Sequence, residues 1–434
     1  MLLSSTRSRS APVGLSAAIR NGVAPDGGLY LPQTMPRARL EKLRPGIGLA
    51  AFTTHLLAPF FAGDALEAQL GTICAESFDF PVPLVKPDEA EPGLRALELF
   101  HGPTGAFKDF GARFLMGCFD RIGDPDDPLT ILAATSGDTG AAVGCAAEGL
   151  SGVRALILFP KGRVSPFQEL QLSCWEKPVE ALEVDGDFDD CQRLVKAAFA
   201  DPALVAAHRL SSANSINIGR WLPQMAYIAA TAVDLFEQTG TAPGFIIPTG
   251  NLGHGFAALY ARAMGLPIGP IVLATNANRT LGEWAATGEY APRPSVATLA
   301  NAMDVGAPSN FERLIHLPPE QRDVRVERID DQEIAARIKA GFRAGYLWCP
   351  HSATAAEAYA RLDEQSKAER TWVVAATAHP YKFAEIIEPL IGETLEPPPP
   401  LRALIGRPTH KAMIPASLDA LTRQIAASLE HAVG

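Results

Sequence analysis

The chain has 434 residues, of which 47% are hydrophobic and 20% are charged, and its formal net charge at pH 7 is −10. This length predicts two or three domains, since one hydrophobic core rarely serves more than about 250–300 residues. The excess of acidic residues argues against a nucleic-acid partner, and no segment is apolar over a sufficient length to cross a membrane.

Cysteine usage and the first twenty residues favour a cytoplasmic protein. The six cysteines show no CxxC pair or other metal-ligand spacing, so we interpret them as small buried thiols in a reducing compartment and expect no metal site. Residues 1–20 carry three arginines and no acidic residue, which superficially resembles a transit peptide. They lack the apolar core of a secretory signal.

Buried strands alternate with helices after a loop-rich start. The opening part has a turn and a short extended piece at residues 24–32. From about residue 93 the pattern predicts strands at 130–135, 153–159, 244–248, 271–276 and 371–377, and helices at 141–150, 256–265 and 351–362. Four prolines at 397–400 indicate a rigid linker before a short helical segment.

These apolar strands do not alternate with polar residues and are separated by helices, which predicts an α/β fold with parallel sheets covered on both faces. Such sheets bind ligands at the carboxyl ends of their strands. Loops 136–140, 249–255 and 377–380 each follow a predicted strand directly. We therefore expect ligand-binding residues in these three loops.

Lys108 lies in the stretch HGPTGAFKDFG (residues 101–111), just after a Gly/Pro turn and at the start of a predicted helix. Desolvation by Phe107 and Phe110 would disfavour its charged form and lower its pKa, which makes the amine a usable nucleophile. The alternative is an ordinary first-turn lysine with its ammonium in water, which is the commoner case for any single lysine.

Three loops suit polar or anionic ligands. In TGNLGHG (249–255) the glycines lie at a strand-to-helix junction, where backbone N–H groups can hold a phosphate, although a plain tight turn looks the same. NSINIGR (214–220) offers amides, a hydroxyl and a guanidinium for a second phosphate, or helix caps at Asn214 or Ser215. SGDTG (136–140) suits a small ligand or a Ser/Thr turn. Neither a dinucleotide-binding fingerprint nor a P-loop is present.

One cofactor accounts for these features together. Pyridoxal phosphate would use the lysine for a Schiff base and the first phosphate site for its own phosphate, and an anionic substrate would use the second. Extended motifs over most of the chain then resemble the threonine synthase family in its larger form, and they stand in that family's order: STR (5–7), APDGGLYLP, HGPTGAFKDFG, ATSGDTGAA, SANSINIGRWLPQ, PTGNLGHG, MDVGAPSNFERL and ATAHPYKF. Because STR and APDGGLYLP resemble the opening of that family, the first residues are better interpreted as part of the enzyme than as a transit peptide.

The resemblance implies the tryptophan-synthase-β-like fold (pyridoxal-phosphate fold type II), with two parallel-sheet α/β domains and an additional small N-terminal domain. On this basis we expect an N-terminal domain at 1–92, a smaller α/β domain with the lysine at 93–210, a larger α/β domain with the phosphate loop at 211–395, and a C-terminal Pro-rich linker and helix at 396–434. A monomer or a homodimer is expected.

The resemblance also implies the roles of individual residues. Lys108 would be the catalytic residue, and the cofactor would be bound by Lys108, Asp138, Gly250, Asn251, Leu252, Gly253 and Thr377. The substrate would be held by Thr139, Ser215, Asn217 and Arg220. Thr377 would face the pyridine nitrogen, and a hydroxyl there suits elimination better than transamination.

The implied reaction converts O-phospho-L-homoserine and water to L-threonine and phosphate by γ-elimination and addition of water at Cβ. One alternative is an O-phosphohomoserine phospho-lyase that gives 2-oxobutyrate, which the motifs do not separate from a synthase. Another is a non-catalytic regulatory protein that binds pyridoxal phosphate. His254 stands where the family usually has an acidic residue, and the roles of His254 and His351 stay open.

Overall fold

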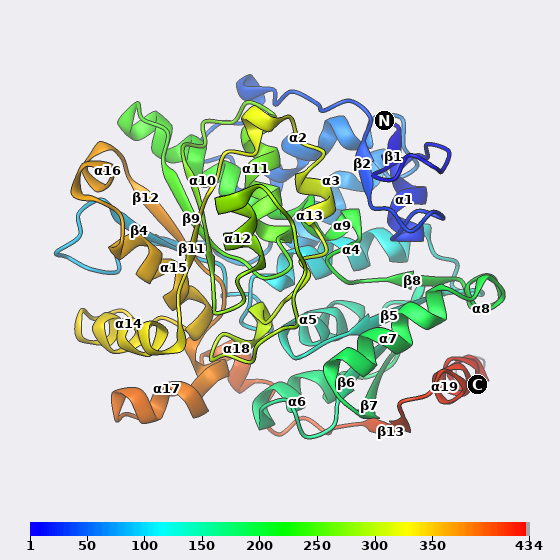
Figure 1. The fold of residues 1–434 in the computed structure, drawn as a ribbon. Helices are drawn as coiled ribbons and strands as arrows, with labels where there is room; N and C mark the ends of the chain where they lie inside the picture. Colours follow the sequence, from blue (N-terminus) through cyan, green and yellow to red (C-terminus); the bar gives the residue numbers. More distant parts are fainter. Residues whose placement is uncertain (431–434) are drawn as a thin grey trace.

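The structure, a computed structural model, describes residues 1–430 of the chain and the side chains of residues 1–427. Figure 1 shows two sheets covered by helices, with a group of N-terminal elements beside them. Eleven strands of the described residues lie in two sheets of six and five strands, in which every neighbouring pair is parallel except β3 and β4. The predicted α/β fold with a small N-terminal domain is confirmed.

The N-terminal unit combines a short antiparallel sheet with three helices. Strand β1 (Leu3–Ser5) pairs with β2 (Tyr30–Pro32), which is the predicted extended piece. The helices are α1 (Leu15–Asn21), α2 (Leu49–Phe61) and α3 (Leu70–Ser77). Apolar residues spaced four apart along α2 are buried on one helix face, and α2 and α3 pack against helices of the main body.

The larger sheet has the strand order β11-β10-β9-β12-β4-β3, and all its neighbours are parallel except β3 and β4. Its strands are β3 (Leu84–Val85), β4 (Leu94–Glu98), β9 (Gly244–Pro248), β10 (Ile271–Thr275), β11 (Arg325–Arg328) and β12 (Trp372–Ala376). Because side chains alternate along a strand, Phe245 and Ile247 join the core beneath α11 (Gly253–Ala263), whereas Ile246 joins the core beneath α15 (Pro350–Ala360).

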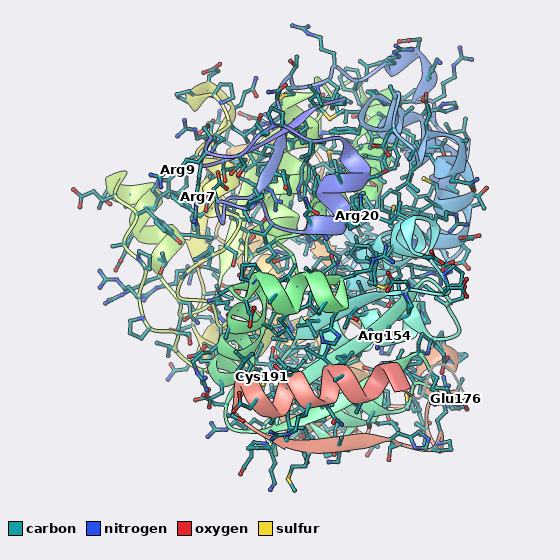
Figure 2. The ribbon with its side chains drawn as sticks, turned by 90° about the vertical axis from the view of Figure 1, so that its right-hand side faces the viewer. Arg7, Arg9, Arg20, Arg154, Glu176 and Cys191 are labelled. Carbon is teal, nitrogen blue, oxygen red and sulfur yellow. The ribbon has the colours of Figure 1, made fainter. Side chains whose placement is uncertain are left out.

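The smaller sheet is parallel throughout and has the order β13-β7-β6-β5-β8. Its strands are β5 (Leu129–Ala134), β6 (Val153–Pro160), β7 (Val179–Asp185), β8 (Leu210–Ser212) and β13 (Lys411–Pro415). Helices α4 (Lys108–Ile122) and α5 (Asp138–Ala147) share one core with it, and α7 (Phe188–Phe199) and α19 (Leu418–Glu430) share the other. Figure 2 shows α19 and β13 on the outer side of this unit, near Cys191 of α7.

The remaining helices connect or cover these units. They are α6 (Pro166–Ser173), α8 (Pro202–His208), α9 (Ile218–Trp221), α10 (Gln224–Thr239), α12 (Thr280–Thr287), α13 (Phe311–Leu314), α14 (Asp331–Arg343), α16 (Glu364–Glu369), α17 (Ala384–Ile391) and α18 (Pro399–Arg402). None of the helices within residues 1–430 combines the length and apolar character that crossing a bilayer requires.

Sheet membership differs from the predicted domain boundaries in two places. Residues 94–98 form β4, which pairs with β12 in the larger sheet, although the prediction placed them with the smaller domain. Residues 411–415 form β13, which pairs with β7, so the segment predicted as a linker and helix also completes the smaller sheet. Both strands are short, and their pairing depends on partners more than 200 residues away in sequence.

Candidate active site

Loops at the carboxyl ends of β5, β9 and β12 line one cavity of about 530 Å³, a volume within the range of about 300–1,000 Å³ usual for small-molecule sites. The three loops predicted to bind a ligand therefore do meet. All the predicted site residues line this cavity except Asn217: Lys108, Asp138, Thr139, Ser215, Arg220, Gly250, Asn251, Leu252, Gly253 and Thr377.

Lys108 is the first residue of α4 and enters the cavity from the segment that follows β4. The preceding backbone is tied to the end of β12, because the N–H of Phe107 donates to the carbonyl of Thr377 at 2.8 Å. The Lys108 side chain is 18% exposed, and its Nζ lies 4.0 Å from Oδ2 of Asp138. Burial lowers the pKa of Lys108, against the raising effect of Asp138.

The two flanking phenylalanines have different roles. The Phe107 ring centroid lies 5.4 Å from the Lys108 Nζ, which fits the predicted desolvation. Phe110 instead points into the hydrophobic core, where its ring lies 4.6 Å from that of Phe80 and 5.0 Å from that of Tyr227. The expectation that Phe110 desolvates the lysine is not supported, because Phe110 lies two positions after Lys108 on α4 and so points to nearly the opposite side of the helix.

The 136–140 loop is both a Ser/Thr turn and part of the cavity. The Thr135 hydroxyl accepts hydrogen bonds from the N–H groups of Gly137 at 3.0 Å and Gly140 at 2.9 Å. This turn starts α5 at Asp138, three residues earlier than predicted, and brings its carboxylate to the cavity. Burial raises the pKa of Asp138, but the charges of Lys382 and Lys108 outweigh it and lower that pKa to about 2.

The glycine loop after β9 ends at the N-terminus of α11. Leu252 has a left-handed conformation with φ of 65°, and helix α11 starts at Gly253. The Asn251 carbonyl accepts from the backbone and side chain of Asn310, at 3.2 and 3.0 Å. A Cβ on Gly250 would lie 2.8 Å from the Cα of Met303. Glycine here therefore allows the loop to pass close to another backbone, and the first N–H groups of α11 have no partner within the helix.

Arg220 is a buried cation at the cavity wall. Its side chain is 3% exposed, and Nη1 donates to the carbonyl of Ala213. Its Nε has no hydrogen-bond partner, and no ion pair to an acid forms within the described residues. Burial lowers the pKa of Arg220 to about 10, so the guanidinium keeps its charge at neutral pH. An anion in the cavity would satisfy it.

Asn217, predicted to hold the substrate, has a structural role instead. Its Nδ2 donates to the carbonyls of Ile19 at 2.8 Å and Ser212 at 3.0 Å, and its Oδ1 caps α9 by accepting from Gly219 at 2.9 Å. Both ends of the amide are therefore satisfied by backbone. The helix cap foreseen for Asn214 or Ser215 falls on Asn217, and Ser215 lines the cavity.

Two buried histidines at the cavity are neutral at physiological pH. The His254 ring stacks on Phe107 with centroids 4.7 Å apart, and neither of its ring nitrogens has a partner. Burial, reinforced by Lys108, lowers the pKa of His254 to about 3. His351 Nε2 accepts from the N–H of Ala302 at 3.1 Å, and burial lowers the pKa of His351 to about 4.

Lys382 is a residue of this region that sequence reasoning left without a role. It belongs to the ATAHPYKF motif after β12, is fully buried, and its Nζ lies 3.1 Å from Oδ1 of Asp138. A usable signal was its position in a loop that follows a parallel strand directly.

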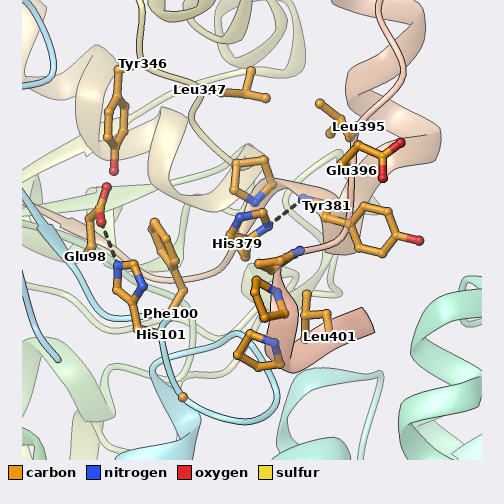
Figure 3. Close-up of a pocket in the computed structure, with 15 residues that line it drawn as sticks. Glu98, Phe100, His101, Tyr346, Leu347, His379, Tyr381, Leu395, Glu396 and Leu401 are labelled. Carbon is orange, nitrogen blue, oxygen red and sulfur yellow. Dashed lines mark hydrogen bonds and ion pairs between the residues drawn. The ribbon is translucent and has the colours of Figure 1, made fainter. Parts of the chain in front are cut away.

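A second cavity, of about 430 Å³, lies where the segments around His101 and His379 meet the C-terminal prolines. Figure 3 shows His101 directed at Glu98, with the His379 ring nearby. Its lining contains neither lysine nor arginine, so this cavity has no amine for a carbonyl cofactor and no fixed cation for a phosphate.

The residues around the first cavity fit pyridoxal phosphate. The buried Lys108 amine has a lowered pKa, and the glycine loop at the start of α11 suits a phosphate. Three buried polar atoms of residues that line the cavity lack a protein hydrogen-bond partner, which is expected where a polar ligand binds: Arg220 Nε, Asn301 Oδ1 and His351 Nδ1.

Comparisons with known proteins agree with this geometry. A family model described as "Pyridoxal-phosphate dependent enzyme" matches residues 79–378. Models described as "Threonine synthase N terminus" and "Threonine synthase, C-terminal" match residues 3–78 and 352–425. Threonine synthase from Haemophilus influenzae is 39% identical over 390 residues, which cover 89% of this chain and 90% of that protein.

Solved structures are similar over almost the whole chain. The crystal structure of threonine synthase from Escherichia coli has a TM-score of 0.90 and 35% identity, covering 98% of this chain and 100% of that one. Pyridoxal-phosphate-bound threonine synthase from Brucella melitensis has a TM-score of 0.90 and 33% identity, covering 99% of both chains. The predicted tryptophan-synthase-β-like fold is thereby confirmed.

Proposed function

Because this chain belongs to the threonine synthase family of pyridoxal-phosphate-dependent enzymes, we propose that its cavity converts O-phospho-L-homoserine and water to L-threonine and phosphate. One observation carries the choice of substrate. The Arg220 guanidinium is buried at the wall of the cavity that also holds Lys108 and the glycine loop, and no carboxylate among residues 1–430 pairs with it. This arrangement supports one anion site for the cofactor and a second one for a phosphorylated substrate.

The residues proposed to hold the cofactor come from both sheets. Lys108 is the amine that attaches to it, residues 250–253 bind its phosphate, and the Thr377 hydroxyl faces its pyridine nitrogen. Asp138 lies beside the lysine. When bound, pyridoxal phosphate supplies an electron sink that stabilises negative charge at the substrate Cα. The Thr377 hydroxyl lies 3.5 Å from that of Ser352, which supports a neutral hydrogen-bonding partner at the ring nitrogen.

Proton transfer and leaving-group stabilisation are assigned to separate groups. The Lys108 amine removes the proton from Cα and later returns it, because its lowered pKa leaves the neutral base available. Arg220 and Ser215 bind the substrate phosphate and stabilise the charge that gathers on it as the C–O bond breaks. Thr139, half-buried at the start of α5, contacts the substrate.

Product analysis tests the proposal. Purified protein with pyridoxal phosphate and O-phospho-L-homoserine should release phosphate and threonine in equal amounts, and Lys108→Ala should abolish both. Lys367→Ala, at a lysine paired with Glu364 outside the cavity, serves as the matched control and should keep parental activity. Phosphate accompanied by 2-oxobutyrate would identify a phospho-lyase, and release of no phosphate would refute the substrate assignment.

We also propose that the protein acts in the cytoplasm. All six cysteines are free, and five of them are buried, which supports a reducing compartment. A monomer or a homodimer remains the prediction for its assembly, and size-exclusion chromatography with light scattering tests it.

A further inference from the structure

Two lysines share one carboxylate at the wall of the cavity. Lys382 Nζ lies 3.1 Å from Oδ1 of Asp138, and Lys108 Nζ lies 4.0 Å from Oδ2 of the same group. The Asp138 side chain is 5% exposed, and that of Lys382 is completely buried. Since burying an unpaired charge is costly, a site with one carboxylate does not favour two ammonium groups.

Lys382 is the better partner of Asp138 on geometric grounds. Besides the shorter ion pair, its Nζ donates to the carbonyl of Thr104 at 2.6 Å. Among residues 1–430 the Lys108 Nζ has no hydrogen-bond partner; it lies near the Phe107 ring, and its one ionic contact is the longer one to Asp138. The ammonium at Lys382 therefore has two oxygen partners. An ammonium at Lys108 would have only the Asp138 carboxylate, which it would share with Lys382.

The position of Lys382 links three parts of the site. It lies in the 3₁₀ turn Pro380–Phe383 that follows β12 and Thr377. Through Thr104 it contacts the HGPTG turn, where Thr104 also binds the Asp109 carboxylate by its N–H at 2.9 Å and its hydroxyl at 2.6 Å. Through Asp138 it contacts the start of α5 in the smaller sheet unit. The turn before Lys108 is thus bound at Thr104 by both Lys382 and Asp109.

Every element packed around Lys108 contributes a titratable or charged group. Asp138 comes from α5, Arg220 from α9, His254 from α11, and Cys349 and His351 from the start of α15, in addition to Lys382. The histidines are neutral at pH 7, because burial lowers their pKa values. Asp138 therefore provides the main negative charge that acts on Lys108, against the positive charges of Arg220 and Lys382. The neighbouring Asp109 carboxylate accepts both hydrogen bonds from Thr104 instead.

We propose that Lys382 is a positioning residue: it occupies the Asp138 carboxylate and the Thr104 carbonyl, and so leaves Lys108 as the free amine that the reaction needs. This inference rests on the proposed role of Lys108, but it concerns the state of the lysine in the chain itself. Without Lys382, Asp138 would pair with Lys108 and hold it as an ammonium, which neither attaches to an aldehyde nor accepts a proton.

The test measures Lys108 directly, without cofactor or substrate. The full chain, freed of pyridoxal phosphate, is pulse-labelled with acetic anhydride across a pH series, and acetylation of Lys108 is quantified by mass spectrometry of its peptide. We expect Lys382→Met to raise the midpoint pH of labelling by about one unit or more, which is a tenfold loss of free amine below the midpoint. Lys382→Arg, which keeps the charge, should restore the parental midpoint.

Controls separate positioning from a purely structural role. Lys367→Met removes an ion-paired lysine outside the site and should leave the Lys108 midpoint unchanged. A folded Lys382→Met protein with the parental midpoint overturns the proposal, even if its melting temperature falls. If Lys382→Met does not fold, Lys382→Gln, which retains a donor for the Thr104 carbonyl, takes its place, with the same expected shift and the same refuting result.

A second readout uses cofactor binding. The rate at which pyridoxal phosphate attaches, followed by absorbance at pH 7, should fall about tenfold in Lys382→Met and recover as the pH is raised above the new midpoint. A rate that is low at every pH contradicts the proposal. Because labelling requires no turnover, failure of the substrate assignment would leave the labelling result standing, and the two hypotheses are tested separately.

Discussion

Replacing Arg220 by methionine removes the buried guanidinium from the cavity and keeps much of the side-chain volume. The parental Nε has no hydrogen-bond partner, while Nη1 donates to the carbonyl of Ala213. The guanidinium therefore has donors free for a substrate phosphate. Its removal should weaken catalysis far more than it weakens the fold, because Arg220 forms no ion pair with an acid in residues 1–430.

The size of the effect follows from the hydrogen bonds lost. A hydrogen bond to a charged group contributes about 1.5–3 kcal/mol, and a two-donor contact to phosphate about twice that. A loss of at least about 3 kcal/mol of transition-state stabilisation corresponds to a hundred-fold or greater fall in kcat/KM. Stability should change little, since the unpaired Ala213 carbonyl costs about 1 kcal/mol and relief of a buried, unpaired cation offsets it.

The assay is kcat/KM for phosphate release from O-phospho-L-homoserine, with the melting temperature measured in parallel. Arg163→Met is the matched control, since Arg163 is an exposed arginine on the rim of the same cavity and should change kcat/KM by no more than about twofold. Arg220→Lys should be intermediate, because lysine keeps the charge without the planar fork. A folded Arg220→Met protein within threefold of the parent would refute the phosphate-binding role.

Three further predictions test the site from other directions. Gly250→Ala should weaken pyridoxal phosphate binding at least about tenfold in a fluorescence titration, because the new Cβ meets the Met303 backbone at 2.8 Å and the loop must shift; unchanged affinity would count against the phosphate loop. Asn217→Ala should lower the free energy of unfolding by about 2 kcal/mol in urea titrations and leave KM for substrate unchanged, because its amide binds only backbone; a raised KM would restore the substrate-binding role. The pKa of His254 is about 3 in the folded chain and near 6.5 in the unfolded chain. Protonation of the unfolded chain below pH 6.5 therefore lowers the free energy of unfolding, by about 2 kcal/mol between pH 7 and pH 5. His254→Phe should remove that loss in urea unfolding at the two pH values, and an equal loss in parent and variant would disprove it.

Much of the architecture was readable from local sequence. The runs at 153–159 and 244–248 are continuous and apolar because their strands are buried on both faces, and both formed strands as predicted. Lys108 was expected at the start of a helix, and the glycine loop was expected between a strand and a helix; both lie there. These features depend on neighbours along the chain, whose side chains and hydrogen bonds the sequence specifies directly.

Contacts between distant segments were decided only by the tertiary structure. The amide of Asn217 looked suited to a phosphate, but its Nδ2 donates to the carbonyl of Ile19, which is 198 residues away in sequence. Phe110 looked suited to the lysine, but the direction of its side chain along α4 places it in the core. Lys382 had no assigned role because its partner Thr104 lies 278 residues earlier. Composition and spacing select the residue types at a site, whereas the pairing of those residues depends on how the sheets bring separate loops together.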